Sequence, residues 1–298
     1  MAIARSRFRE LVGLDEPEVA LIARRIEMQD GYVVEHLRLR LGDTEVRGLL
    51  TRPEDDTRRL PAILYGHSHG GGYGIGASEL LEGREYLLDP LGPAFARAGY
   101  VTLSIDMPVF GERASLSEGY AAKALLWHGK SLFGQMLSDH SAALTYLASR
   151  EDVDPARIGA FGISMGCVLS YWLAAADERI AAVAHLCCFA DLRTMIDLGA
   201  HDGHGIYLTV PGLLREADGG SIAALIAPRP QLVCIGEADA LTPPLAVERA
   251  WAELEPAYAD VRDRLELVSE PGVGHRETPA MRAAAMAFFA THLAPPMG

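Results

Sequence analysis

A serine flanked by two glycines lies between an expected strand and an expected helix. Gly162-Ile163-Ser164-Met165-Gly166 follows the mostly apolar segment 157–161 and precedes the apolar segment 167–175. This order is the sequence form of a nucleophile elbow, a turn so tight that a Cβ at either glycine would collide with neighbouring backbone. Such a turn lifts the Ser164 hydroxyl clear of the sheet and directs the backbone N–H of Met165 to the place where an oxyanion would form. We therefore predict that Ser164 is a catalytic nucleophile.

The partners expected for Ser164 are a base and a carboxylate on two later loops. A serine hydroxyl is a poor nucleophile until a base takes its proton, and the base needs a carboxylate that holds its tautomer. In an open α/β sheet such groups belong on loops at the carboxyl ends of strands. Asp239 lies three residues after the expected strand 232–236, and His275 lies shortly after the expected strand 265–269. The sequence therefore predicts a triad of Ser164, His275 and Asp239.

A glycine-rich loop offers the second donor of an oxyanion hole. The expected buried strand 61–66 runs into His67-Ser68-His69-Gly70-Gly71-Gly72. Small residues let the amides of such a loop approach a substrate closely. We expect the backbone N–H of His69 to act beside that of Met165, with the N–H of Gly70 as the near alternative.

Taken together, these motifs resemble the α/β-hydrolase superfamily. The resemblance runs from about Tyr32 onward and includes the elbow, the loop 67–72, the segment 106–113 and the Asp and His loops. The segment 239–243 is similar to the dienelactone-hydrolase-like and acetyl-xylan-esterase-like branch, although dienelactone hydrolases have a cysteine where this chain has Ser164. The resemblance implies hydrolysis of carboxylic esters through an acyl-enzyme, without a cofactor. Lactonases, thioesterases and peptidases use the same machinery and remain alternatives.

The rest of the chain supplies the elements that must position these residues. Buried apolar strands alternating with helices predict an α/β-hydrolase fold, with a mostly parallel sheet and helices on both faces. An antiparallel N-terminal hairpin is expected from 32–41 and 45–51. We expect a helical N-terminal extension over 1–30 and one catalytic domain over 31–298, with a cap insertion at about 189–220. The further strands are expected at 61–66, 100–106, 157–161, 180–187, 231–236 and 265–269, and the helices at 93–98, 131–150, 167–175, 222–226, 245–254 and 279–293.

Aromatic and polar side chains near the site suggest the size of the substrate. Rings close to the nucleophile would fill volume that a long acyl chain needs, which favours acetyl to about butyryl groups. The polar tips of the cap residues would suit a hydroxylated alcohol better than a lipid. The side chains expected to line this pocket are Tyr73, Phe110, Trp127, His201, His204 and Tyr207.

Four histidines also raise the alternative of a metallohydrolase. His67 and His69, with His201 and His204, have residue types that bind zinc. A metallo-β-lactamase-like pattern would place Asp and His where this chain has Gly71 and Gly72. Metal ligands would also leave the elbow unexplained, so we expect no metal and keep this as the remote alternative.

Composition excludes several other functions. The 298 residues carry a net charge of −13, which argues against a nucleic-acid or anionic-membrane surface. The N-terminal stretch lacks the apolar core of a signal peptide, and the four cysteines lie in apolar contexts typical of free thiols in a cytosolic protein. We therefore expect a cytoplasmic enzyme that acts on a small-molecule ester; a homodimer is compatible with the sequence. A scaffold without catalysis would usually have lost a triad position, and none is lost here.

Overall fold

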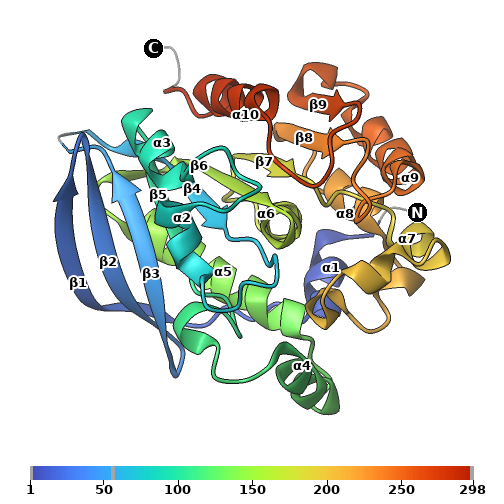
Figure 1. The fold of residues 1–298 in the computed structure, drawn as a ribbon, viewed down its shortest axis with the longest axis horizontal. Coiled ribbons are helices and arrows are strands. Elements are labelled where there is room, and N and C mark those ends of the chain that lie inside the picture. Colours follow the sequence, from blue (N-terminus) through green and yellow to red (C-terminus); the bar gives the residue numbers. More distant parts are fainter. Residues whose placement is uncertain (1–2, 55–57, 296–298) are drawn as a thin grey trace.

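A mixed β-sheet forms the centre of the structure, which is a computed structural model (Figure 1). Within residues 3–54 and 58–295, which the structure describes, nine strands lie in the order β1-β2-β3-β5-β4-β6-β7-β8-β9. The first three strands and β5 pair antiparallel, and the strands from β5 to β9 pair parallel. Their bounds are β1 Val19–Gln29, β2 Tyr32–Leu41, β3 Thr44–Arg52, β4 Leu60–Gly66, β5 Val101–Ile105, β6 Val153–Ile163, β7 Ala182–Leu186, β8 Gln231–Gly236 and β9 Leu265–Glu270.

Helices cover both faces of this sheet, as predicted. One buried apolar cluster joins the sheet to α1, α5, α6, α8 and α9, and a second joins its other face to α2, α3 and α10. The bounds are α1 Arg5–Val12, α2 Glu79–Glu82, α3 Leu91–Arg97, α4 Glu118–Trp127, α5 Leu132–Ser149, α6 Met165–Ala176, α8 Gly219–Ala224, α9 Pro244–Leu254 and α10 Pro279–His292. All four cysteines are buried and unpaired, which confirms the expectation of free core thiols.

Local sequence signals explain where the long helices begin. The Ser131 side chain accepts a hydrogen bond from Gly134 N–H and caps α5, and the Thr278 side chain accepts one from Met281 N–H and caps α10. Pro279 occupies the first position of α10, where its missing N–H costs nothing. Among the described residues, no helix has the length and hydrophobicity that crossing a bilayer requires.

The N-terminal segment differs from the helical extension expected over 1–30. Only Arg5–Val12 is helical, whereas Val19–Gln29 forms β1, the edge strand of the sheet; residues 1–2 lie outside the described part of the chain. Most residues of β1 are exposed, and its pairing with β2 shifts register between Leu21 and Ala23. A strand exposed on both faces needs no alternation of apolar and polar residues, so the usual signal for a strand is missing.

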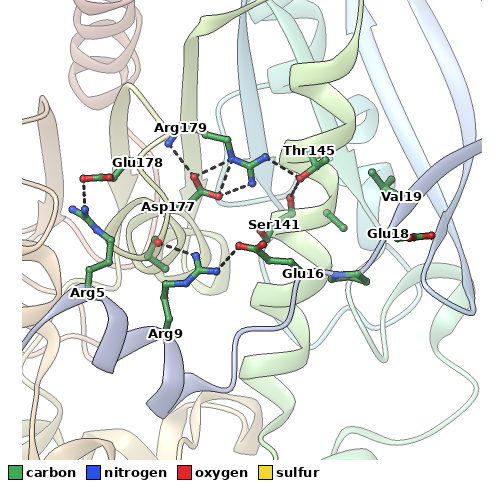
Figure 2. A pocket seen from close by; sticks show the side chains of 13 residues that line it. Arg5, Arg9, Glu16, Glu18, Val19, Ser141, Thr145, Asp177, Glu178 and Arg179 are labelled. Carbon is green, nitrogen blue, oxygen red and sulfur yellow. Dashed lines mark hydrogen bonds and ion pairs between the residues drawn. The ribbon is translucent and has the colours of Figure 1, made fainter.

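Helix α1 packs against the far end of the helix that follows Ser164 (Figure 2). Arg5 Nε donates to Ala175 O over 2.8 Å, and an Arg9 guanidinium N–H donates to Ala176 O over 3.1 Å. These guanidinium groups therefore satisfy carbonyls at the C-terminal end of α6, where cations are favoured. A cavity of about 890 Å³ lies here, but its arginines are engaged by helix carbonyls and by carboxylates such as that of Glu16.

Short helices and turns between β7 and β8 form the segment expected as a cap. They are α7 (Leu192–Asp197), the 3₁₀ turns η3 (Ala200–Gly203), η4 (Ile206–Leu208) and η5 (Leu213–Arg215), and then α8. The Asp218 side chain caps α8 and also accepts from the Leu192 N–H over 2.6 Å. Asp218 therefore connects the start of this segment to its end.

Candidate active site

Ser164 occupies the strained turn that its glycine neighbours predict. It links β6 to α6 with φ 61° and ψ −121°, a backbone conformation that non-glycine residues rarely adopt. A Cβ added at Gly162 would lie 2.4 Å from the backbone of Gly166, and one added at Gly166 would lie 1.9 Å from Gly66 O. Only glycine fits at either position. The strained serine is held by its own N–H, which donates to Leu186 O over 3.0 Å.

His275 and Asp239 form a hydrogen-bonded pair on neighbouring loops. His275 Nδ1–H donates to Asp239 Oδ2 over 2.7 Å, and the Asp239 side chain is 1% exposed. The other carboxylate oxygen accepts the Leu241 N–H over 2.9 Å. The two loops can approach because β8 ends in Gly236, where a Cβ would lie 2.4 Å from Val273 O. The pairing fixes the tautomer of His275 and leaves its Nε2 for a reacting group.

Ser164 and His275 line one cavity of about 340 Å³. The loop after β4 and the cap segment complete its wall, which includes His69, Gly70, Gly71, Tyr86, Gly203, His204, Gly205, Tyr207 and Leu241. All three residues of the predicted triad therefore belong to one site. Their roles in catalysis remain predictions.

The amides expected to form the oxyanion hole belong to His69 and Gly70, which line this cavity, and to Met165, which directly follows Ser164. Met165 is the first residue of α6, so its N–H has no partner within the helix and lies at the positive end of the helix dipole. In the loop after β4, Gly70 and Gly71 have φ of 45° and 67°. The Gly71 N–H is already used, because it donates to His69 Nδ1 over 3.1 Å. His69 and Gly70 therefore remain the candidates for the second donor.

A buried carboxylate that the sequence analysis missed holds His69 in place. Glu118, at the start of α4, is 5% exposed and accepts His69 Nε2–H over 2.7 Å. It also accepts the Tyr73 hydroxyl over 2.7 Å and the Tyr207 N–H over 2.8 Å. Burial alone would raise the pKa of Glu118, but these hydrogen bonds outweigh it and hold the pKa below its usual value. Glu118 thus joins the loop after β4 to the cap segment.

A second buried carboxylate supports the same loop from the other side. Glu79 is fully buried and accepts the Ser68 N–H over 2.9 Å, and the Ser68 hydroxyl contacts both Glu79 and the Tyr86 hydroxyl. Tyr86 lines the cavity, and burial together with the Glu79 charge raises its pKa to about 12. Tyr86 is therefore a neutral hydrogen-bonding group at the wall of the site.

The six residues predicted to line the pocket occupy different positions in the structure. His204 and Tyr207 line the cavity, and the Tyr207 ring stacks on His69 at 5.3 Å between centroids. Phe110 is fully buried and packs under His69, so it supports the wall without lining it. Trp127 was predicted wrongly, because it projects from α4 and is 89% exposed. An aromatic residue at the end of an exposed helix has no sequence feature that separates it from a pocket residue.

Tyr73 and His201 lie at neighbouring cavities. The Tyr73 hydroxyl reaches Glu118 and the ring stacks on Phe110, but Tyr73 lines a separate cavity beside residues 114–119. His201 is exposed and lines a cavity within the cap segment. Neither side chain lines the cavity that contains Ser164.

The histidines of the metallohydrolase alternative have other partners. His67 is buried, which lowers its pKa; its Nδ1–H donates to Ser68 O over 3.0 Å, and its Nε2 accepts the Met107 N–H over 3.2 Å. Both nitrogens of His69 are engaged as described above, and His204 Nε2–H donates to the backbone of the Asp239 loop. Across residues 3–54 and 58–295, no group of three or more His, Cys, Asp or Glu side chains is arranged to hold a metal ion.

Comparisons with known proteins place this geometry among hydrolases. Residues 123–295, more than half of the chain, match the model of the prolyl oligopeptidase family. YtaP of Bacillus subtilis (strain 168), a provisionally named hydrolase, is 37% identical over 278 residues, which are 92% of this chain and 93% of YtaP.

The solved structures that share the fold include two esterases. Acetyl xylan esterase 1 from Thermoanaerobacterium sp. JW/SL YS485 is 17% identical with a TM-score of 0.68, over 97% of this chain and 92% of that one. A glucuronoyl esterase from Solibacter usitatus is 15% identical with a TM-score of 0.70, over 97% and 92%. At such identities these structures establish the fold alone.

Proposed function

Because the chain belongs to the prolyl oligopeptidase family and has the α/β-hydrolase fold, we propose that it is a serine hydrolase that cleaves carboxylic esters of short acids. The family match and the solved structures confirm the α/β-hydrolase fold that the sequence motifs predicted. The observation that carries the proposal is that a nucleophile, a base and candidate oxyanion donors come together at one cavity. A serine in a strained elbow lines the same cavity as a histidine whose Nδ1–H is held by a buried aspartate, and residues that can supply backbone amides line it too.

Each group of the site can carry out one step of ester hydrolysis. His275 Nε2 takes the proton of Ser164 Oγ as that oxygen attacks the ester carbonyl carbon. The carbonyl oxygen becomes an oxyanion, which accepts hydrogen bonds from the Met165 N–H and from the N–H of His69 or Gly70. His275 then gives its proton to the leaving alcohol oxygen as the carbon–oxygen bond breaks. Water, activated by the same histidine, releases the acid from the acyl-enzyme.

Asp239 stabilises the imidazolium that forms between these steps. Its side chain is 1% exposed, and it already accepts both the His275 Nδ1–H and a backbone N–H. An anion with little access to solvent interacts strongly with a cation in hydrogen-bond contact. Asp239 therefore favours the protonated histidine without itself taking the proton.

The packed wall of the cavity favours a short acyl group. The ester group and the acyl chain share a volume of about 340 Å³. Tyr86, Tyr207 and Leu241 belong to its wall, and Tyr207 is almost fully buried, so that side cannot recede without unpacking the cap. Acetyl to about butyryl groups fit such a site best.

A series of p-nitrophenyl esters from acetyl to octanoyl tests the proposal. We expect kcat/KM to be highest between acetyl and butyryl, and Ser164→Ala to lose on the order of 10³-fold or more. Ser115→Ala, which changes an exposed serine elsewhere, is the matched control and should behave as wild type. Faster turnover of octanoyl than of butyryl esters would contradict the short-acyl proposal, and retention of more than a tenth of the activity in Ser164→Ala would contradict the role of Ser164.

Peptide-bond hydrolysis is the second candidate, because the matching family takes its name from an oligopeptidase. The same serine, base and oxyanion hole can cleave amides as well as esters. Dipeptide p-nitroanilides measured beside the esters separate the two. A kcat/KM for an anilide above that for the acetyl ester would make peptidase the better assignment.

A further inference from the structure

A second cavity, of about 480 Å³, lies within the cap segment. Most of its lining is aliphatic and comes from α7 and the turns that follow, including Leu192, Met195, Ile206, Leu208, Val210 and Leu213. Its polar lining residues His201, Asp202 and Thr209 are exposed at the rim, as are Ile196 and Ile206, and the fourth polar side chain, that of His204, is half-buried. The interior of this cap cavity is therefore suited to an apolar group rather than to a hydroxylated one.

The cap cavity adjoins the cavity that contains Ser164. His204 and Gly205 line both of them. His204 Nε2–H donates to Leu241 O over 2.8 Å, so this shared wall is attached to the loop that carries Asp239. Burial lowers the pKa of His204, which keeps the ring neutral and leaves the shared wall without a charge.

We propose that the cap cavity binds the apolar alcohol group of the substrate, while the short acyl group occupies the cavity at Ser164. This inference rests on the proposed esterase function and narrows its substrate class to esters of short acids with apolar alcohols. The position of His275 decides which part of the ester is assigned to the cap cavity, because His275 must reach the leaving alcohol oxygen to protonate it. The shared wall is bonded to the loop of Asp239, and Asp239 holds His275, so the cap cavity adjoins the side of the site that carries the base.

The polar residues that would favour a hydroxylated alcohol lie at the rim of this cavity or are already hydrogen-bonded. His201 is exposed at the rim, and the Nε2–H of His204 is already used by Leu241. A sugar hydroxyl entering the cavity would lose hydrogen bonds to water and gain few from aliphatic side chains, which costs free energy. An alkyl or aryl group would gain from the same transfer.

Acetate esters of increasing alcohol length test the assignment. For methyl, butyl and hexyl acetates hydrolysed by the intact protein in a pH-stat, we expect kcat/KM to rise about fourfold for each added methylene that becomes buried. Methyl esters of the corresponding acids should show no such rise. A flat response to alcohol length, or a rise along the acid series instead, would overturn the assignment.

A pair of variants in the cap segment tests whether the dependence of kcat/KM on alcohol length arises in the cap cavity. Ile196 lines the cap cavity and is 48% exposed, whereas Leu198, two residues on and 53% exposed, lies outside both cavities. Because both are exposed, neither replacement by aspartate should prevent folding. We expect Ile196→Asp to lower the ratio of hexyl to methyl acetate kcat/KM by about tenfold, and Leu198→Asp to retain the wild-type ratio.

The outcomes separate this inference from the proposed function. If acetate esters are hydrolysed and Ser164→Ala abolishes that activity, but the hexyl to methyl ratio is near one or is equal in Ile196→Asp and Leu198→Asp, then only the alcohol site is wrong. If wild type hydrolyses no acetate ester, or Ser164→Ala retains the activity, then the proposed function itself fails.

Discussion

Replacing Glu118 with glutamine tests whether a buried carboxylate holds the oxyanion loop. The Glu118 carboxylate accepts hydrogen bonds from His69 and Tyr73 on one oxygen and from the Tyr207 N–H on the other. Glutamine has nearly the same size, but it offers one acceptor oxygen and one donor amide. If the oxygen faces His69 and Tyr73, the amide group points at the Tyr207 N–H, and two donors oppose each other.

The expected loss follows from these contacts. A buried donor without an acceptor costs about 1–3 kcal/mol, and the remaining bonds lose the assistance of the charge. We therefore expect the free energy of unfolding to fall by about 2 kcal/mol, with Tm lower by about 5 °C. The loop that bears His69 would shift, and a displacement near 1 Å in a positioning element can lower kcat by about a hundredfold. A fall in kcat of about tenfold to a hundredfold is the predicted result.

The assay compares kcat on a short-acyl ester and urea unfolding for two variants. Glu82→Gln, on the exposed face of α2, removes the same charge from a neighbouring element and is the matched control. It should stay within about 0.5 kcal/mol of wild type. If Glu118→Gln kept both the kcat and the free energy of unfolding of wild type, the carboxylate would have no role in holding the loop.

The stability difference between wild type and Glu118→Gln should depend on pH in a defined direction. Burial would raise the pKa of Glu118, but hydrogen bonds from His69, Tyr73 and Tyr207 prevail and lower it from 4.5. A carboxyl whose pKa is lowered on folding contributes stability that is complete above its unfolded pKa and is lost as the pH falls through its folded pKa. The difference in unfolding free energy between wild type and Glu118→Gln should therefore be complete near neutral pH and shrink below about pH 4.5.

Three further predictions concern the triad, the metal alternative and the elbow. His275→Ala should lower kcat by about 10³-fold or more, and Asp239→Asn somewhat less, in the same ester assay; near-normal kcat in either variant would exclude its residue from the triad. EDTA should leave activity unchanged, whereas loss on chelation with recovery by Zn²⁺ would support the metal alternative. Gly166→Ala should lower the free energy of unfolding by more than about 3 kcal/mol, because its Cβ would lie 1.9 Å from Gly66 O. Gly119→Ala, whose Cβ would meet nothing within 4 Å, is the control in urea unfolding, and equal stability of the two variants would argue against the close approach.

The sheet and the nucleophile turn could be predicted because their signals are local. Apolar runs bounded by turn residues mark buried parallel strands, and the observed strands from β4 to β9 fall where those runs predict them. Gly162 and Gly166 were recognisable because a turn that tight leaves no room for a Cβ, and the structure confirms the collision. The same kind of signal failed for β1, an exposed edge strand whose order comes from hydrogen bonds to β2 rather than from burial of one face.

The contacts that shape the site were decided only by the tertiary structure. Glu118 meets His69 and Tyr73 from the loop after β4 and Tyr207 from the cap segment, and no spacing along the sequence records that meeting. The exposed position of Trp127 and the aliphatic interior of the cap cavity were hidden for the same reason. Backbone geometry depends on steric limits within a few residues, so sequence alone determined the turn and the strand and helix on either side of it. Which side chains line a cavity depends on how distant elements pack, and that is settled only when the whole core forms.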